Sequence, residues 1–502
     1  MRPVCQTVLL VLFLLSSNAQ MFAQDFDIVV LNGRVMDPDT GFDAIANVGI
    51  QDGRITTITE DTIGGEVTLD ATGHIVAPGF IDLHAHGFSD EAIRYRLFDG
   101  VTTALELEWG SPRIAEWMAA REGACRIHYG AAVSHGTLRV LAMPNLDPDG
   151  DSIIAEYNRA VAVSEPLQAF AEMEFLRQRR DDGLSPEETE RMLLLLDEGL
   201  RYGGLGIGMC HQYYPGATRA EIFRVFQFAA EKHVPIFVHV RQMGMAAMQE
   251  VIANAAATGA ALHILHVNSM SLGEIREILQ LIGEARDRGI DVTTEAYPYT
   301  AASTALESAI FDDGWQERLG ISYGDLQWQD TGERLTEESF KRYREEKGTV
   351  IIHMMKEEWI ELAVKTPFVM IASDAMPWAP GAHPRSAGTY ARVLGRYVRE
   401  RQVLDLMTAL GKMTIMPAKR METIAPSMKN KGRVQVGADA DLVVFNPDTI
   451  NDKADFENGL DYSTGMQHII VSGTIVLQDS ELVERRFPGR AIVNQYLDST
   501  DD

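Results

Sequence analysis

Eight short apolar runs, separated by helical stretches, most constrain what this chain can fold into. The runs are Ile75–His84, Thr102–Glu108, Ile127–Val133, Gly204–Met209, Pro235–His239, Ala261–His266, Asp291–Tyr297 and Phe368–Ser373. Helical patterns such as Pro186–Gly199, Arg219–Lys232 and Leu272–Arg288 lie between most of them. Strands that alternate with helices over roughly 350 residues predict an α/β protein built on a (β/α)₈ barrel, the TIM-barrel architecture.

The two ends of the chain follow a different pattern. Short β-type runs at residues 25–74 and 430–490 are separated by turn signals, among them Asn32-Gly33 and Asp52-Gly53. Such dipeptides between alternating runs indicate β-hairpins. Neither end is long enough for a stable core, so both are predicted to form one small β-sandwich domain beside a barrel at 75–429. The interval at about 303–366 is too long for a bare connection and predicts an insertion over the barrel mouth.

The N-terminus has the pattern of a cleaved signal peptide over residues 1–23. Arg2 precedes the apolar run Val8 to Leu15, and small residues at Ala19 and Ala23 suit cleavage. This pattern predicts export to the periplasm or the medium, with no membrane association after cleavage. A retained membrane anchor is the alternative. Only Cys125 and Cys210 lie beyond this segment, too few for a disulfide framework.

Composition narrows the class of partner. The formal net charge is −27, from 45 basic and 72 acidic residues, which argues against nucleic-acid binding because that needs a basic surface. The apolar fraction of 46% is that of an ordinary globular enzyme. A small molecule is therefore the expected partner, and a homo-oligomer is one of the states that the sequence allows.

Histidines lie at the carboxyl ends of several predicted strands. His84 and His86 end the first strand and point the same way, because side chains alternate faces. His239 ends the fifth strand, His266 ends the sixth, and Asp374 follows the eighth. This face of a barrel holds the active site, and imidazole nitrogens with a carboxylate oxygen suit Zn²⁺. The spacing predicts a metal site.

These residues resemble the amidohydrolase superfamily, and within it the chain is most similar to the N-acyl-D-amino-acid deacylases. The similarity covers nearly the whole mature chain, from Asp27 to Val443. The matching segments are Ser134-His135-Gly136-Thr137-Leu138-Arg139, Tyr213-Tyr214-Pro215-Gly216, Tyr297-Pro298-Tyr299-Thr300-Ala301 and His383-Pro384-Arg385-Ser386-Ala387-Gly388-Thr389. The resemblance implies a metal-dependent barrel together with a β-domain made from both chain ends.

The resemblance also implies an activity, the hydrolysis of non-peptide carbon–nitrogen bonds in N-acyl-D-amino acids. It implies one or two Zn²⁺ ions, with Mn²⁺ as an alternative, and attack by a metal-activated hydroxide. Asp374 is expected to be both a metal ligand and the general base, then acid. Arg385 is expected to bind a substrate carboxylate, and Tyr297, His135 and Tyr213 to contact the substrate.

One departure from the deacylase pattern concerns the metal ligands. The pattern has a cysteine at the end of the second strand, where this chain has Glu106 and Glu108, and no lysine lies near the end of the fourth strand. A carboxylate is therefore predicted to take the bridging position. Glu108 is preferred because it lies nearest the strand end, and Glu106 is the alternative.

A second departure concerns the substrate. Asn268 stands where the deacylase pattern has a lysine, and an amide cannot supply that positive charge to a substrate carboxylate. Hydrolysis of cyclic amides or small dipeptides on the same metal site is therefore an alternative function. A metal-free, non-catalytic scaffold is an alternative of a different class, and it predicts broken ligand positions.

Overall fold

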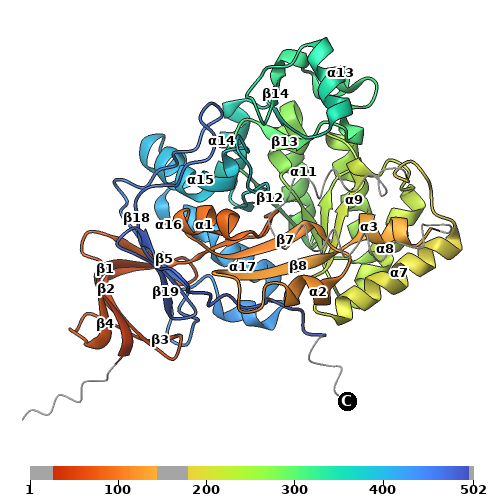
Figure 1. Ribbon diagram of the computed structural model, residues 1–502. Helices are drawn as coiled ribbons and strands as arrows, with labels where there is room; N and C mark the ends of the chain where they lie inside the picture. The colour runs from red at the N-terminus through yellow and green to blue at the C-terminus, as the bar shows by residue number, and fades with distance from the viewer. Residues whose placement is uncertain (1–25, 144–178, 497–502) are drawn as a thin grey trace, which may run out of the picture.

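The computed structural model describes residues 26–143 and 179–496, and the predicted signal peptide at 1–23 lies outside these ranges. Figure 1 shows a barrel, a β-domain that holds the first and last strands, and a small sheet near α13 (Glu337–Glu346) at the top of the view. Within the described ranges, no helix is both long enough and apolar enough to cross a bilayer.

Eight parallel strands form the barrel, in the order β6-β7-β8-β9-β10-β11-β12-β16. Their bounds are β6 (Phe80–Asp82), β7 (Val101–Ser111), β8 (His128–Ser134), β9 (Ile207–Cys210), β10 (Ile236–His239), β11 (Leu262–Ile264), β12 (Val292–Ala296) and β16 (Val369–Ile371). The strands are almost entirely buried, as expected of a parallel sheet that helices cover. The prediction of a (β/α)₈ barrel is confirmed.

Helices follow the barrel strands, as the alternation along the sequence predicts, and α12 and α13 belong to the insertion. Besides α13, their bounds are α1 (Asp90–Phe98), α2 (Ile114–Ala119), α3 (His135–Leu141), α7 (Pro186–Arg201), α8 (Arg219–Lys232), α9 (Met245–Thr258), α10 (Val267–Ser271), α11 (Ile275–Asp287), α12 (Trp315–Leu319), α14 (Glu357–Lys365), α15 (Arg385–Arg392), α16 (Leu406–Met413) and α17 (Ile415–Met421). The start of α7 is fixed by a capping box, in which Ser185 and Glu188 each accept the other's backbone N–H. This box satisfies two N–H groups that a helix terminus would otherwise leave free.

The seam between β6 and β16 is closed by a buried side chain. Asp82 Oδ1 accepts the backbone N–H of Ser373 at 3.0 Å and that of His84 at 3.2 Å. The Ser373 hydroxyl donates to Asp82 Oδ2, and Ala85 and Ala375 form a parallel bridge next to it. Asp82 therefore ties together the two strand ends that carry ligands of the predicted metal site.

The β-domain is a nine-stranded sheet to which both chain ends contribute. Its strands are β1 (Phe26–Asp37), β2 (Phe42–Gln51), β3 (Arg54–Thr59), β4 (Gly65–Asp70), β5 (Ile75–Pro78), β17 (Leu442–Phe445), β18 (Met466–Val471), β19 (Thr474–Gln478) and β20 (Glu481–Leu482). The two ends meet where β5 pairs with β17, and residues from both ends, such as Val48 and Val444, share one buried apolar cluster. The prediction that the ends fold together is confirmed.

Two local predictions in this region are wrong. The run Ile75–His84 is not one strand, because β5 belongs to the β-domain sheet and β6 to the barrel, so the barrel begins after Gly79 and not at residue 75. A Cβ at Gly79 would lie 2.2 Å from Thr102 Oγ1, so only glycine fits at this change of sheet. Asn32-Gly33 is not a turn but a bulge inside β1, where Asn32 adopts a φ of 62°.

The predicted insertion is present but shorter than expected. Its core is the three-stranded sheet of β13 (Ala302–Ala305), β14 (Leu326–Trp328) and β15 (Thr349–Ile352), in which β15 pairs with both others. The helix α14 lies inside the predicted range of 303–366 but packs against α11 and β16. It is therefore the barrel helix that precedes the last strand, and the amphipathic pattern alone did not distinguish it from the insertion.

A buried ion pair of the β-domain also contacts the barrel through His128 of β8. Lys431 Nζ lies 2.6 Å from Asp441 Oδ2 and 3.0 Å from Asp439 Oδ2, and His128 of β8 lies 3.1 Å from Asp441 Oδ1. Burial acts to raise the pKa of Asp441, but the charge of Lys431 outweighs it and holds the pKa far below its ordinary value. The contact therefore stabilises the junction only while Asp441 is ionised.

Asp441→Asn is expected to lower the free energy of unfolding by about 3 kcal/mol at pH 7, because it removes the closest carboxylate from a buried ammonium. Because folding depresses the pKa of Asp441, its ionised carboxylate stabilises the fold above the ordinary pKa of about 4. This stabilisation is lost as the pH falls further. The wild-type advantage should therefore shrink below pH 4. Urea unfolding at several pH values measures both effects, and Asp439→Asn, at the more exposed carboxylate, is the matched control with a smaller loss. A loss under about 1 kcal/mol in Asp441→Asn would contradict this account.

Candidate metal centre

Four histidines and two carboxylates converge at the carboxyl ends of the barrel strands. His84 and His86 follow β6, His239 ends β10, and His266 lies just beyond β11. Glu108 projects from β7, next to a register shift against β8, a type of irregularity that is frequent beside active sites. The sixth residue, Asp374, follows β16, and all six side chains are buried. The structure thus brings together every predicted metal ligand.

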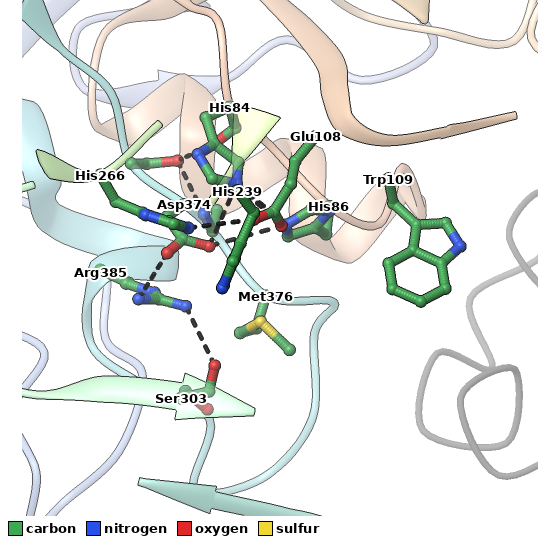
Figure 2. A network of polar contacts seen from close by, with 12 residues as sticks. His84, His86, Glu108, Trp109, His239, His266, Ser303, Asp374, Met376 and Arg385 are labelled. Atoms are coloured by element: carbon green, nitrogen blue, oxygen red, sulfur yellow. Dashed lines mark hydrogen bonds and ion pairs between the residues drawn. The ribbon is translucent and has the colours of Figure 1, made fainter. Parts of the chain in front are cut away.

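Glu108 lies at the centre of this group, as Figure 2 shows. Its Oε1 lies 2.8 Å from His239 Nδ1 and 3.0 Å from His266 Nε2. Its Oε2 lies 3.2 Å from His84 Nε2 and 3.1 Å from His86 Nε2. One carboxylate therefore faces two pairs of imidazole nitrogens, which is the arrangement of a bridging ligand.

The candidate metal centre consequently has two halves. The His84/His86 half comprises His84, His86, Glu108 and Asp374, and the His239/His266 half comprises Glu108, His239 and His266. The donor atoms of each half lie within 4.8 Å of one another. Nitrogen and oxygen donors at this spacing match the ligand preference of Zn²⁺, which accepts three or four protein ligands.

Electrostatics support the binding of a cation. Burial acts to lower the pKa of His84, but the charges of Asp374 and Glu108 outweigh it and raise the pKa well above its ordinary value. The Nε2 atoms of His84 and His86 face each other at 3.2 Å, so a proton or a metal ion between them removes the repulsion of their two lone pairs. A potential that attracts protons this strongly also attracts a divalent ion.

Asp374 faces the metal ligands with one oxygen and Arg385 with the other. Its Oδ1 lies 3.4 Å from His84 Nε2 and 3.6 Å from His86 Nε2, while its Oδ2 lies 2.8 Å from Arg385 Nη1. The backbone of Asp374 has a φ of 51°, which non-glycine residues seldom adopt outside functional sites. This constrained backbone holds the carboxylate between the metal ligands and the arginine.

The alternative bridging residue, Glu106, lies outside the centre of the group. Its Oε2 is 2.8 Å from His86 Nδ1, the ring nitrogen that faces away from Glu108, and its Oε1 accepts the backbone N–H of Trp109 at 3.2 Å. The two glutamates point to the same side of β7, as their spacing predicts, but only Glu108 reaches both halves.

A cavity opens above the metal ligands. Its lining includes the predicted substrate contacts Tyr213 and Tyr297, together with Ser303 and Thr304 of the insertion. The hydroxyl of Tyr213 lies 2.8 Å from Thr304 Oγ1. The insertion therefore forms one wall of the cavity, in agreement with its predicted place at the barrel mouth.

Two predicted substrate contacts lie elsewhere. His135 is buried outside the cavity lining, with Nε2 3.4 Å from Glu221 Oε1, because the helix α3 begins at this residue and turns it away from the mouth. Arg385 is buried behind Asp374, with its guanidinium carbon 4.7 Å from the centre of the Tyr297 ring. Asp374 and Tyr297 line the cavity, whereas Arg385 lies behind them and is not part of the described lining.

Sequence reasoning missed three residues that contact this site. Glu295, inside β12, lies 2.7 Å from His84 Nδ1, and Gln212 lies 2.7 Å from His239 Nε2. Ser303 lines the cavity, and its Oγ is buried without a hydrogen-bond partner among the described residues. The one available signal was Glu295, since a charged residue inside an otherwise apolar strand needs a buried partner.

The sequence matches a known protein family over most of its length. The family model described as "Amidohydrolase family" matches residues 67–477. An N-acyl-D-glutamate deacylase of Alcaligenes xylosoxydans xylosoxydans is 29% identical, over 93% of this chain and 97% of the relative. A D-aminoacylase of the same organism is 28% identical, over 92% of this chain and 96% of the relative.

Solved structures agree with these relatives. An N-acyl-D-glutamate deacylase of Bordetella bronchiseptica, complexed with zinc and a phosphonate inhibitor, has a TM-score of 0.77 at 26% identity, with 94% of this chain and all of that chain covered. A D-aminoacylase studied for its binuclear metal centre also has a TM-score of 0.77, at 25% identity, with 93% of this chain and all of that chain covered. The match to the family model spans most of the sequence, and the chain belongs to the amidohydrolase family.

Proposed function

We propose that this protein is a zinc-dependent hydrolase that removes the acyl group from N-acyl-D-amino acids. The observation that carries this proposal is Glu108, whose two oxygens each face a pair of histidine nitrogens at the floor of the cavity. The similarity to N-acyl-D-glutamate deacylase and D-aminoacylase supports the choice of bond and substrate class. In the related D-aminoacylase one metal activates and a second attenuates, so we propose that this chain also holds one or two ions.

The two halves of the centre would hold the ions. Zn²⁺ supplies Lewis-acid chemistry there, which polarises an amide carbonyl and lowers the pKa of water. Mn²⁺ accepts the same oxygen and nitrogen donors and is the alternative ion. Glu108 carries a full negative charge towards both positions, because the facing histidines hold its pKa well below the ordinary value although burial opposes this.

Asp374 moves the proton in this proposal. Its Oδ1 accepts a proton from water as the water oxygen bonds to the carbonyl carbon, and it returns the proton to the amide nitrogen as the C–N bond breaks. Burial acts to raise the pKa of Asp374, but the charges of Arg385 and His84 outweigh it and lower the pKa. The carboxylate is therefore ionised at neutral pH, which is the form that a general base requires.

A group of buried polar atoms forms a site for the substrate carboxylate. Arg385 Nε and Ser303 Oγ are both buried with no hydrogen-bond partner among the described residues. Leaving such groups unpaired costs about 1–3 kcal/mol each, which a carboxylate oxygen can recover. Asn268 does not contribute, because its Nδ2 donates to the Tyr297 carbonyl at 3.1 Å. Arg385 therefore supplies the positive charge by itself.

The remaining cavity wall suits an apolar substituent. It contains Trp109, Met243, Met270, Ile310, Met354 and Met376. Methionine side chains adapt to groups of different shape, and apart from Arg385, which lies behind Asp374, no lysine or arginine is available at the described lining for a second carboxylate. We therefore expect turnover of substrates with apolar side chains or acyl groups to exceed that of substrates with a second carboxylate.

The test is elemental analysis of the purified mature protein together with amine release from matched N-acetyl-D- and N-acetyl-L-amino acids. Bound zinc with D-selective release is the expected result. Bound zinc with release only from cyclic amides or dipeptides would replace the substrate class and retain the metal centre. No bound metal under zinc-replete conditions would reject the proposal.

Arg385→Leu is expected to raise KM for an N-acyl-D-amino acid about 10–100-fold, because a charge-assisted contact to the substrate carboxylate is worth about 1.5–3 kcal/mol. The corresponding amino-acid amide lacks that carboxylate, so its KM should change little. Both substrates should share any fall in kcat that follows from the loss of the pair with Asp374. Equal changes in KM for both substrates would remove Arg385 from the carboxylate site.

We also propose that the protein is exported. The support is the sequence alone, in which Arg2, an apolar run and the small residues Ala19 and Ala23 precede the described part of the chain. N-terminal sequencing of the protein recovered from the periplasm and the medium tests this, with a start between residues 20 and 25 as the expected result. Recovery of the intact N-terminus in the membrane fraction would favour a retained anchor.

A further inference from the structure

The arginine and the serine assigned to the substrate carboxylate lie on two segments that are far apart in the sequence. Ser303 belongs to β13 of the insertion, and Arg385 is the first residue of α15. The direct contact between them is long, 3.5 Å from Arg385 Nη2 to the Ser303 carbonyl oxygen (Figure 2). A two-point site for a carboxylate needs its parts held to within about 0.5 Å, which a contact of this length does not provide by itself.

His383 links the same two segments. Its Nδ1 lies 3.0 Å from the backbone nitrogen of Arg385, and its Nε2 lies 3.0 Å from the carbonyl oxygen of Ala301. Ala301 is the residue immediately before β13, which carries Ser303. One buried imidazole therefore joins the start of α15 to the start of the strand that holds the other half of the carboxylate site.

The two hydrogen bonds of His383 fix the form of its ring. A backbone N–H only donates, so Nδ1 accepts from Arg385 and carries no proton, and Nε2 carries the proton that it donates to Ala301. Burial and the charge of Arg385 lower the pKa of His383 well below its ordinary value, which keeps the ring neutral. The rings of Tyr299 and Phe456 pack edge-on against it, with centres 5.5 and 5.0 Å away. The ring is therefore held in the one tautomer that makes both contacts.

The sequence at the start of α15 explains why this helix needs the side chain at position 383. Pro384 occupies the N-cap position and has no side-chain acceptor, so the first N–H of the helix, that of Arg385, would otherwise lack a partner. His383 supplies the acceptor from one residue further back. The contact therefore fixes the backbone from which the Arg385 side chain extends.

We propose that His383 is a positioning residue, which aligns Arg385 and Ser303 for the substrate carboxylate through its hydrogen bonds to the Arg385 N–H and the Ala301 carbonyl. The proposal rests on the carboxylate site of the proposed function, and it adds what holds the two parts of that site together. Both ring nitrogens of His383 are occupied by backbone groups, so the residue acts through its neighbours and contacts no substrate.

The test is KM of the zinc-loaded mature protein for an N-acetyl-D-amino acid and for the corresponding amide, which lacks the carboxylate. His383→Leu removes both hydrogen bonds and is expected to raise KM for the acid about 5–20-fold, in the range that the loss of one or two hydrogen bonds gives. KM for the amide should change by less than about threefold, and zinc content should stay that of the wild type. Equal changes in the two KM values, or an unchanged KM for the acid, would overturn the proposal.

Two milder variants separate the contacts and remain informative if the leucine variant does not fold. Asparagine places an oxygen near the position of Nδ1 and keeps an acceptor for the Arg385 N–H, whereas glutamine places an N–H near the position of Nε2 and keeps a donor to Ala301. His383→Asn and His383→Gln should each raise KM for the acid about 2–5-fold, with the amide unchanged. A rise as large as that of His383→Leu in both variants, or none in either, would overturn the role of the hydrogen bonds.

A double variant tests whether His383 acts through the arginine. In the Arg385→Leu background, His383→Leu should raise KM for the acid by no more than about twofold further, because the group that it positions is gone. A double variant in which the two single effects multiply would overturn the proposal.

His468→Leu is the matched control. His468 is also buried, and its Nδ1 accepts the backbone N–H of Asp479 at 3.2 Å, but it lies in β18 of the β-domain. Its KM values for the acid and the amide should match those of the wild type, and a KM rise for the acid alone in this variant would overturn the assignment to His383. A wild type whose KM for the acid is no lower than for the amide has no carboxylate site, which overturns the substrate class together with this inference. Preference of the wild type for the acid, combined with equal KM changes in His383→Leu, overturns the inference alone.

Discussion

Asp374→Asn is expected to lower kcat for N-acyl-D-amino acids by about 10³–10⁴-fold while the variant retains bound zinc. The asparagine side chain has the same size, and its oxygen can still face His84 and His86. It cannot accept a proton at neutral pH, so water loses its base and the departing nitrogen loses its acid. The remaining ligands of both halves are unchanged, which is why metal content should stay close to that of the wild type.

Steady-state kinetics and elemental analysis on the same preparation measure both quantities for Asp374→Asn. Met376→Leu is the matched control, because Met376 also lines the cavity near Asp374 but has no proton to move. Its kcat should stay within about threefold of the wild type, since an exchange of similar volume is well tolerated. Turnover of the asparagine variant within tenfold of the wild type would remove Asp374 from proton transfer.

Glu108→Ala is expected to weaken zinc binding in both halves by at least about 100-fold, and activity should fall with it. Glu108 is the one described side chain that faces all four histidines, so its removal takes one donor from each half at once. It also leaves the imidazoles without the negative charge that lies between them. Retention of two tightly bound zinc ions in this variant would show that Glu108 is not the shared ligand.

Two further substitutions at position 108 separate charge from size. Glu108→Gln preserves the volume but not the charge, so it should bind zinc almost as weakly as the alanine variant. Glu108→Cys introduces the thiolate that the deacylase pattern has at this strand end, and thiolate is a strong zinc ligand. Zinc content should therefore recover in the cysteine variant. Dialysis against a graded zinc buffer, followed by elemental analysis, ranks the three variants.

The barrel and the ligand cluster were predictable because both follow from strand geometry. A strand that alternates its side chains places His84 and His86 on one face, and parallel strands bring their carboxyl ends to one edge of the sheet. The same rule was enough to predict that His239, His266 and Asp374 belong to the cluster. The prediction of Glu108 required a choice between two glutamates, and Glu108 was preferred to Glu106 because it lies nearer the strand end.

The rest depends on contacts between segments far apart in the sequence. Glu295 and Gln212 face histidines on other strands, and no local pattern states which ring nitrogen a side chain will meet. His135 begins a helix, which turned it away from the cavity in spite of its place after a barrel strand. The pairing of Arg385 with Asp374 likewise joins two side chains whose mutual orientation is set by tertiary packing.

The single residue between β5 and β6 has a consequence for biosynthesis. Gly79 links β5 to β6, and β6 directly precedes the ligands His84 and His86. In the β-domain sheet, β5 pairs with β17, where Pro78 lies opposite Leu442. The ribosome delivers β5 long before β17, and ladders of such large sequence separation form slowly. The anchor of His84 and His86 is thus completed only when nearly the whole polypeptide has been synthesised. We therefore expect assembly of the ligand cluster to be a late event in the folding of this protein.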